Sequence, residues 1–278
     1  MIRTMTTAVN TMNQLQSNLD IIGNNLSNIN THGYKNNQAS FQEMLYQQFN
    51  NDKADTAQRQ SPEGIRYGVG AMLSQTQMNW KVGALQVTDR NLDFALTEPK
   101  QYFNIIKQGA DGPETVYTRQ GNFYLSPGTG NQVSLVDGEG NAVSDRAGNA
   151  IQFTGPVDQF ELKPDGTLVA ASANGNEQTA ELAVTVIERP NLMTRLSSTH
   201  FTLPENMEEM NITETDILTE LTGANTAEIG IQQGALEGSN VDYQKEMTDL
   251  INVQRSYQFN SRTVSIADQM LGLINNIR

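Results

Sequence analysis

Residues 24–35 read NNLSNINTHGYK, and they close a helical pattern that begins near Met5. Asparagine and glycine are poor residues for a helix interior but frequent helix terminators. We therefore expect the first helix to stop at a signal made of Asn30, Gly33, Tyr34 and Lys35. Tyr34 and Lys35 would then carry the chain toward its middle, and His32 would be a turn residue.

Apolar or small residues before this stop recur at alternating steps of three and four, which is a heptad pattern. They are Met5, Ala8, Met12, Leu15, Leu19, Ile22, Leu26 and Ile29. The other end of the chain repeats the pattern with Leu250, Val253, Tyr257, Asn260, Val264, Ala267, Leu271 and Ile274, and Met247 widens the stripe. A single polar residue in such a row, here Asn260, commonly fixes helix register. The patterns predict two long helices, residues 5–29 and 247–277, that pair as a coiled coil.

The middle of the chain alternates apolar and polar residues, as in FELKPDGTLVA at residues 160–170, and is broken by Asp-Gly, Gly-Asn and Pro turn signals. The fold class we predict is α+β, with split N- and C-terminal coiled-coil helices and an inserted all-β domain. The expected parts are a first helix at 1–35, an extended connector at 36–86, a β-rich domain at 87–204, a return connector at 205–240 and a second helix at 241–278. Within the first connector, residues 50–64 are expected to form a loop, and Met78 and Trp80 to be packing residues.

Charge is nearly absent from the first helix, because residues 1–34 contain only Arg3 and Asp20. A free coiled coil carries Glu and Lys beside its seam. Amides suit a helix surrounded by protein, since a buried charge must be desolvated and paired. We therefore expect the heptad residues, with the amides of Asn24, Asn25 and Asn28, to form an interface between copies of the chain. An intramolecular helix pair with an amide-rich outer face stays open, whereas a membrane-surface helix would need Lys and Arg on its polar face.

The same composition makes the isolated helices only marginally stable in water, because Asn, Ser, Thr and Gly are poor helix formers. We expect residues 1–30 and 245–278 to be mobile in the monomer and to fold on association.

The bulk composition restricts the partners. Eighteen Lys and Arg against 31 Asp and Glu give a net charge of −13. This disfavours nucleic acid and anionic membranes as partners. The chain has no cysteine, which excludes disulfides, thiolate nucleophiles and cysteine-based metal centres. The N-terminus lacks the continuous apolar region of a Sec signal peptide, and no stretch reaches the length needed to span a bilayer. Export would need another route.

Catalytic and cofactor-binding motifs are lacking. His200 lies near Ser197, Ser198 and Thr199 without a G-x-S-x-G motif, so we interpret the group as loop polarity. Asp137, Glu139, Asn141 and Asp145 suggest a calcium loop, but the glycine and closing glutamate of an EF-hand are missing, and two consecutive tight turns explain them better. No nucleotide-binding glycine motif is present. We expect no metal, cofactor or small-molecule substrate, and no enzyme.

Both ends of the chain resemble the bacterial flagellar axial proteins, the rod and hook family. The first signature is matched by Asn24, Asn25, Leu26, Ser27 and Asn28, followed by Thr31, Gly33, Tyr34 and Lys35. The second is matched by Glu237, Ser239, Asn240, Val241, Glu246, Met247, Gln254, Arg255, Tyr257, Asn260, Asp268, Met270 and Leu271. The phrases NLDFAL, VYTRQGNFYL, SLVDGEGNAV and FELKPDGTLVA stand in the family's order between them. Two departures concern the subclass: TEPKQYFNI retains only Phe103 of a Gly-x-Gly-Phe-Phe phrase, and TRLSSTHFTLP lacks a Gly-x-Asn ending.

This resemblance implies a structural subunit of the flagellar basal body, similar in length to a distal-rod or hook–basal-body protein. Such subunits are exported by the flagellar type III apparatus and assemble outside the cytoplasmic membrane with copies of themselves and other rod and hook proteins. Their terminal helices form the inner layer of a tube that transmits torque and serves as an export channel. We expect Asn240 and Arg255 to lie at the interface between copies. The alternative from the residues is a secreted oligomeric binding module, such as an adhesin, scaffold or cap protein with a coiled-coil stalk.

Overall fold

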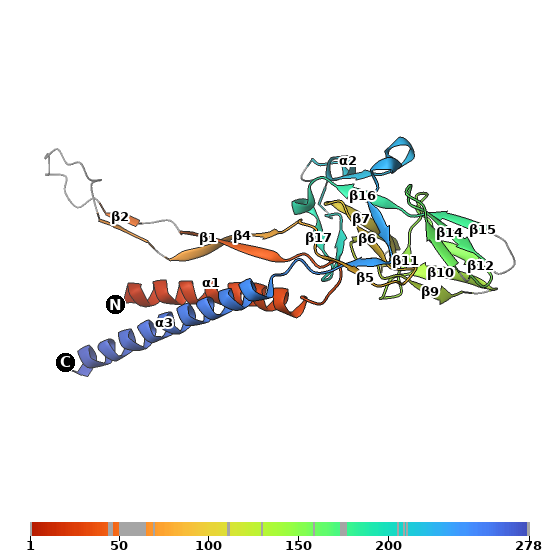
Figure 1. The fold of residues 1–278 in the computed structure, drawn as a ribbon. Coiled ribbons are helices and arrows are strands. Elements are labelled where there is room, and N and C mark those ends of the chain that lie inside the picture. The colour runs from red at the N-terminus through yellow and green to blue at the C-terminus, as the bar shows by residue number, and fades with distance from the viewer. Residues whose placement is uncertain are drawn as a thin grey trace. The chain divides into compact units, whose positions relative to one another are not determined.

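The computed structural model describes residues 2–43, 47–49, 65–68, 70–109, 112–128, 130–157, 159–172, 177–204, 206–207, 209 and 211–276. The loop expected at residues 50–64 therefore lies outside the described residues. A helix begins the described chain and another ends it, with strands between them, so the α+β class is confirmed (Figure 1). Within the described ranges, no helix is both long and apolar enough to cross a membrane.

The helices are α1 (Ile2–Ser27), α2 (Glu214–Ile217) and α3 (Tyr243–Asn276), with 3-10 turns at Pro190–Leu192 and Gly223–Glu228. The strands are β1 (Asn37–Glu43), β2 (Gln47–Phe49), β3 (Ile65–Tyr67), β4 (Ala71–Met78), β5 (Leu85–Val87), β6 (Phe94–Leu96), β7 (Gln101–Gln108), β8 (Pro113–Thr118), β9 (Tyr124–Pro127), β10 (Gln132–Val136), β11 (Ala142–Val143), β12 (Gln152–Thr154), β13 (Gln159–Leu162), β14 (Thr167–Ala171), β15 (Glu177–Glu181), β16 (Val184–Ile187), β17 (Thr194–Arg195), β18 (His200–Thr202), β19 (Leu218–Glu220), β20 (Ile231–Gln233) and β21 (Ala235–Glu237).

The chain divides into two compact units. Unit 1 consists of Met1–Ser27, Asn37–Gln77 and Asp242–Arg278, and unit 2 of Asn28–Asn36 and Met78–Val241. In unit 1, α1 and α3 lie side by side, and β1 pairs with β4 and contacts α1 (Figure 1). The two ends of the chain therefore belong to one unit, although more than 200 residues separate α1 from α3 in sequence.

Unit 2 is built around β7. Among the described residues a ten-stranded sheet runs in the order β12-β10-β11-β7-β8-β18-β17, with β16 also pairing with β7 and β19, and β9 with β10. The strands β13, β14 and β15 form a separate antiparallel meander. β7 is central because it pairs with three strands, β8, β11 and β16.

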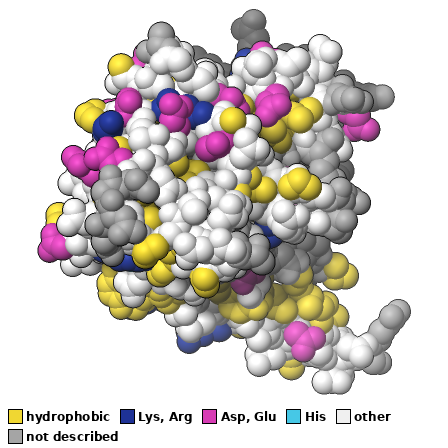
Figure 2. Space-filling view, turned by 90° about the vertical axis from the view of Figure 1, so that its right-hand side faces the viewer, with side chains coloured by type: hydrophobic (Ala, Val, Ile, Leu, Met, Phe, Trp, Pro, Cys, Tyr) yellow, Lys and Arg dark blue, Asp and Glu magenta, His cyan; other side chains and the backbone are white. Residues whose placement is uncertain are grey.

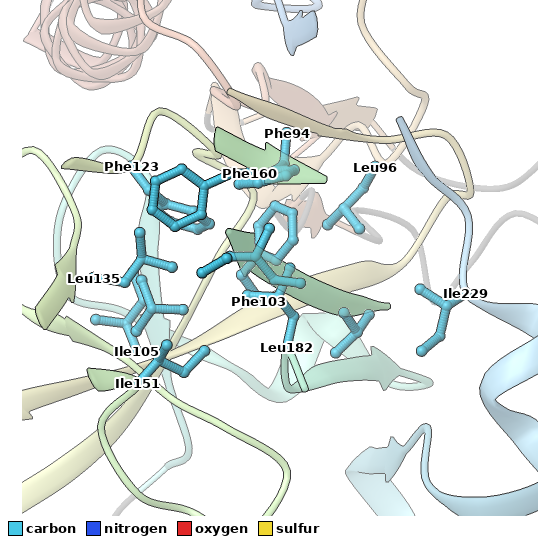
Figure 3. Close-up of a cluster of buried hydrophobic side chains, with 14 of the residues drawn as sticks. Phe94, Leu96, Phe103, Ile105, Phe123, Leu135, Ile151, Phe160, Leu182 and Ile229 are labelled. Atoms are coloured by element: carbon cyan, nitrogen blue, oxygen red, sulfur yellow. The ribbon is translucent and has the colours of Figure 1, made fainter. Parts of the chain in front are cut away.

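The side chains of β7 pack alternately into two hydrophobic cores, since successive side chains of a strand point to opposite faces. Phe103 and Ile105 enter one cluster with Phe94, Phe123 and Leu135, where Phe103 and Phe123 meet edge to face at 5.3 Å between ring centroids (Figure 3). Tyr102 enters the other cluster. Met78 and Trp80 pack against that second cluster, so their prediction as packing residues is confirmed.

Residues 205–240, which we expected to be a return connector, contribute secondary structure to unit 2. They contain α2, β19, β20 and β21, and β20 and β21 pair with β6 and β5. These strands are three residues long, too short for an alternating pattern to be recognised. Their partners lie more than 130 residues earlier in sequence, so no local pattern predicts the pairing.

The helix boundaries also differ from the expected ones. α1 ends at Ser27, and Asn28, Ile29 and Asn30 form a turn that belongs to unit 2, so the prediction of a helix through residue 29 is wrong. His32 lies in the turn that follows, as predicted. Ile29 keeps the heptad spacing although it lies in the turn after the helix. Residue spacing alone does not determine the backbone conformation.

We predict that Phe103→Ala destabilises unit 2 by about 3–5 kcal/mol, because it removes a fully buried ring from a packed core. The measurement is chemical denaturation followed by the fluorescence of Trp80, the single tryptophan, which packs in unit 2. Val87→Ala is the control. Val87 is 71% exposed, and its truncation should stay within about 0.5 kcal/mol. Equal effects of the two variants would contradict this account of the core.

Candidate functional site

The heptad residues follow the more protected side of each helix in unit 1. In α1, Ala8 and Ile22 are buried and Met5, Met12, Leu15, Leu19 and Leu26 are half-buried. In α3, Val253 and Ala267 are buried, Met247, Leu250, Tyr257, Asn260, Val264 and Leu271 are half-buried, and Arg255 and Ile274 are exposed. The pattern therefore marks the sides of α1 and α3 that are covered within one chain, most fully at Ala8, Ile22, Val253 and Ala267.

The amides of α1 have partners inside the chain. Asn25 is 1% exposed, and its side chain donates to the carbonyl of Asn37 at 2.8 Å and accepts from the N–H of Asn37 at 3.0 Å. Gln14 accepts from the N–H of Leu73 in β4 at 2.8 Å. Amide side chains on α1 thus satisfy backbone groups of the β1–β4 pair. Asn25 is unsuited to the cross-subunit bond that we predicted, because the same chain uses its amide and covers it.

Asn260 uses its amide within its own helix, where it donates to the carbonyl of Ser256 at 2.9 Å. Asn24 is exposed on α1, and Asn28 lies in the turn after the helix. The role of these residues between copies stays a prediction.

The outer side of α3 exposes large apolar side chains. Phe259 is 72% exposed, Leu273 64% and Ile266 55%, and Ile251, Met270 and Ile274 are also exposed. Scattered exposed apolar residues are ordinary on a surface, but a row of them along one helix marks an interaction site. This side of α3 has no covering element among the residues that the structure describes.

Charge is divided unequally between the units. Unit 1 contains eight Lys and Arg against nine Asp and Glu, a net charge of −1, whereas unit 2 contains ten against 22, a net charge of −12. On the face seen in Figure 2, acidic side chains are spread across the surface instead of gathered in one patch. Electrostatic repulsion between like surfaces would therefore be weaker for unit 1 than for unit 2.

The stop signal of the first helix is part of unit 2. Tyr34 is fully buried beneath the guanidinium of Arg195, which lies 4.9 Å from the ring centroid. Gly33 has φ +72°, and its N–H donates to the carbonyl of Glu237 at 2.8 Å. A Cβ at Gly33 would lie 2.7 Å from the backbone of Arg119, so only glycine fits this approach.

Lys35 and Arg119 meet at one carboxylate, that of Glu237. Lys35 Nζ lies 2.6 Å from Glu237 Oε1, and Arg119 Nε lies 2.6 Å from Glu237 Oε2. All three side chains are about 1% exposed or less. The N–H of Gly83 also donates to Oε1, at 2.8 Å. We call this group, Lys35, Arg119 and Glu237, the signature junction, because it joins residues of both terminal signatures to the middle of the chain.

The remaining donors of the junction bind backbone carbonyls. Arg119 Nη1 donates to the carbonyls of Glu98 and Gln101, and Nη2 to that of Leu96. Lys35 Nζ donates to the carbonyl of Lys81 at 2.6 Å. A buried charge is tolerable only when its hydrogen-bonding capacity is filled in this way.

The junction carries one surplus positive charge, and this falls on Lys35. Burial and the nearby Arg119 lower the pKa of Lys35 to about 8, against the opposing pull of Glu237. From the sequence we expected Lys35 at the helix stop, and we predicted no ion pair for Glu237 or Arg119. The available signal was a charged residue beside apolar residues or glycine. It occurs at Lys35 in GYK, at Arg119 in YTRQG and at Glu237 in LEGS.

Asn240 of the second signature also binds backbone groups in unit 2. Its side chain accepts from the N–H of Asn36 at 2.8 Å and donates to the carbonyls of Asn79 and Lys81 at 2.8 and 3.0 Å. One amide thus links the residue after Lys35 to the segment between β4 and β5. The structure gives Asn240 a role within the chain, and its contact with another copy stays a prediction.

His200 is buried in β18, so its prediction as a loop residue is wrong. Its Nε2 lies 3.2 Å from Asp137 Oδ2, and its Nδ1 lies 2.8 Å from Ser197 Oγ. Burial raises the pKa of Asp137, but hydrogen bonds from His200, Asn141 and the N–H of Glu139 outweigh it and the pKa is lowered. Ser197 Oγ accepts from the N–H of His200 and of Thr199, which is the geometry of a turn.

The two tight turns predicted at residues 137–149 are confirmed. Asp137 Oδ1 accepts from the N–H groups of Glu139 and Asn141, and Asp145 Oδ1 from those of Ala147 and Asn149. The carboxylates of Asp137 and Asp145 are thus occupied by backbone donors. In the described part of the chain, no group of three or more His, Asp and Glu side chains is placed to hold a metal ion.

Comparisons with known proteins match both ends of the chain. A family described as "Flagella basal body rod protein" matches residues 5–35, and one described as "Flagellar basal body rod FlgEFG protein C-terminal" matches residues 232–277. The chain is 41% identical over 285 residues to the flagellar hook-basal body complex protein FlhP of Bacillus subtilis, with 100% of both chains covered. It is 28% identical to the flagellar basal-body rod protein FlgG of Bacillus subtilis over 279 residues, with 100% of both covered. It is 30% identical to FlgG of Agrobacterium fabrum over 285 residues, with 98% of each covered.

We predict that the members of the signature junction differ sharply in their effect on stability. Glu237→Gln leaves two buried cations without their carboxylate and should destabilise unit 2 by about 3–5 kcal/mol. Lys35→Met removes the surplus charge and leaves the Arg119–Glu237 pair intact, so it should cost about 1 kcal/mol or less. Denaturation followed by Trp80 fluorescence compares the two. Equal destabilisation would refute the assignment of the surplus charge to Lys35.

We predict that unit 2 becomes more stable as the pH rises from about 8 to 10. The pKa of Lys35 is about 8 in the folded protein and 10.5 in the unfolded chain, so in this window the unfolded state holds the extra proton and loses it on folding. Stability should rise by up to about 1.4 kcal/mol per pH unit. Above pH 10 the trend should reverse, because burial raises the pKa values of Tyr102 and Tyr117. Denaturation at stepped pH measures this, and Lys35→Met should abolish the rise.

Proposed function

The chain belongs to the bacterial flagellar basal-body rod and hook–basal-body family, and we propose that its copies polymerise through unit 1 into a tubular part of the flagellar shaft. The family gives it a structural role in the flagellum. Neither matched family is described by a catalytic activity. The proposed polymer would contain other rod and hook proteins above or below this subunit, transmit motor torque and serve as an export channel for later subunits.

The observation that carries the proposed mode of assembly is the exposed apolar row on α3, led by Phe259, Ile266 and Leu273. Covering each of these side chains would contribute about 1.5–3 kcal/mol. The near-neutral charge of unit 1 supports the same site, since repulsion between copies would be weak there. Unit 2, with a net charge of −12, is less suited to close contact with its own copies.

Assembly also accounts for the poor helix formers in the terminal helices. In the dilute monomer, residues 1–30 and 245–278 would be mobile, and association would order them. Export by the flagellar type III apparatus and a location outside the cytoplasmic membrane are part of the same proposal. In the polymer, α1 and α3 would complete a coiled coil whose seam is the heptad row. Contacts that repeat head to tail generate an open helical polymer of this kind.

We predict that Leu271→Asp lowers incorporation into the flagellum at least tenfold, because it places a charge in the half-buried row of α3. Ser265→Asp adds the same charge at an exposed position of the same helix and should assemble normally. The measurement is the amount of each variant in basal bodies isolated from the native bacterium. Unit 2 should unfold at the wild-type denaturant concentration in both variants, as followed by Trp80.

Normal incorporation of Leu271→Asp, or an equal loss with Ser265→Asp, would contradict assembly through the helices. Leu19→Asp tests α1 in the same way. Deletion of residues 1–30 in the native bacterium addresses the flagellar role itself, since normal filaments and swimming after the deletion would refute it.

A further inference from the structure

The exposed side of α3 is a continuous stripe with two arginines in it. We call the row Ile251, Arg255, Phe259, Arg262, Ile266 and Leu273 the outer stripe. All six side chains are exposed. Steps of three or four residues, or their sums, separate them, so they share one side of the helix. Among the described residues neither arginine takes part in an ion pair.

A groove of about 300 Å³ opens in the same unit between the end of α1, the start of β1 and the start of α3. We call it the amide groove. Its lining includes Ile21, Ile22, Gln38, Asp249, Asn252 and Val253. The volume is about ten times the roughly 30 Å³ that a water molecule occupies in the liquid. It is therefore large enough for several side chains, and it offers both apolar walls and amide groups to an incoming segment.

The groove and the outer stripe face different directions on α3. Successive helix residues turn by about 100° and rise by about 1.5 Å, so the groove residues of α3 lie roughly 110° around the helix and roughly 20 Å along it from the centre of the stripe. A two-fold contact would need the stripe and the groove to lie in one shared patch that faces the same partner. Two different surfaces on one helix instead allow a copy to contact one neighbour through its stripe and another through its groove.

Charge is complementary between the two surfaces. The outer stripe contains Arg255 and Arg262 and no acidic residue. The groove contains Glu246 and Asp249 against Lys245, a net charge of −1. Asp249 is half-buried and, in the described part of the chain, has no cationic partner. Stripe against stripe would bring two pairs of arginines together, which is unfavourable. Stripe against groove places an arginine near an unpaired carboxylate, so electrostatics favour the head-to-tail contact.

We propose that the outer stripe of one copy docks in the amide groove of the next, with Phe259 and Ile266 entering the groove and Arg262 pairing with Asp249. This inference rests on the proposed polymerisation through unit 1 and specifies which surfaces meet. The occupant of the groove is a second copy of this chain. The amides of the groove then bind the neighbouring helix, while Asn25 holds β1 within its own chain.

The absence of cysteine makes cross-linking a clean test. Phe259→Cys and Gln38→Cys, an exposed groove position on β1, are produced separately and together in the native bacterium, and isolated basal bodies are mildly oxidised. A disulfide-linked dimer is expected only when both variants are present, because residue 259 of one copy meets residue 38 of another. Ser265→Cys replaces Phe259→Cys in the control and should give no dimer with Gln38→Cys. A dimer from Phe259→Cys alone, or no dimer from the incorporated pair, would overturn the head-to-tail contact.

A charge exchange gives a second and independent measurement. Asp249→Arg and Arg262→Asp should each lower incorporation by roughly tenfold when produced alone, because each places like charges opposite one another. Produced together they should restore it, since the changed groove accepts the changed stripe and the unchanged groove accepts the unchanged stripe. Failure of this rescue, while Leu271→Asp still blocks assembly, would refute the docking and leave polymerisation through unit 1 standing. Normal assembly of Leu271→Asp would instead refute the proposed polymerisation first.

Discussion

The carboxylate of Glu237 brings three distant segments of unit 2 together where the two terminal signatures meet. It accepts from Lys35, Arg119 and the N–H of Gly83, and these groups come from three distant parts of the sequence. A buried pair of this kind adds little net stability compared with apolar residues, but removal of one partner is costly. The junction therefore acts through specificity, since only the native pairing of both signatures satisfies its charges.

The burial of the junction changes the meaning of the two signatures. Gly33, Tyr34 and Lys35 at one end and Glu237 and Asn240 at the other appear in sequence as flanks of assembling helices, yet they bind backbone and side chains of unit 2. The helices that they flank belong to unit 1. The signatures thus close the β unit with residues from both ends of the chain, so unit 2 is complete only when both ends are present.

The two units divide the physical tasks of the protein. Unit 2 contains the aromatic core and almost all of the net charge. Unit 1 has a net charge of only −1 and a row of large apolar side chains on α3 that one chain leaves exposed. A surface of that kind gains most of its stabilisation from a second copy, which is the physical basis of the proposed polymer.

The sequence by itself determined the two helices, the β-rich middle, the turns at residues 137–149 and the family, because each depends on local spacing or on a contiguous motif. Tertiary structure alone decided that Lys35, Arg119 and Glu237 share one buried site, that Asn25 binds β1, and that β20 and β21 complete unit 2. These contacts join residues far apart in the chain, and a charged or amide residue looks the same in sequence whether water or a distant backbone group satisfies it. Only the fold brings the partners within hydrogen-bonding distance.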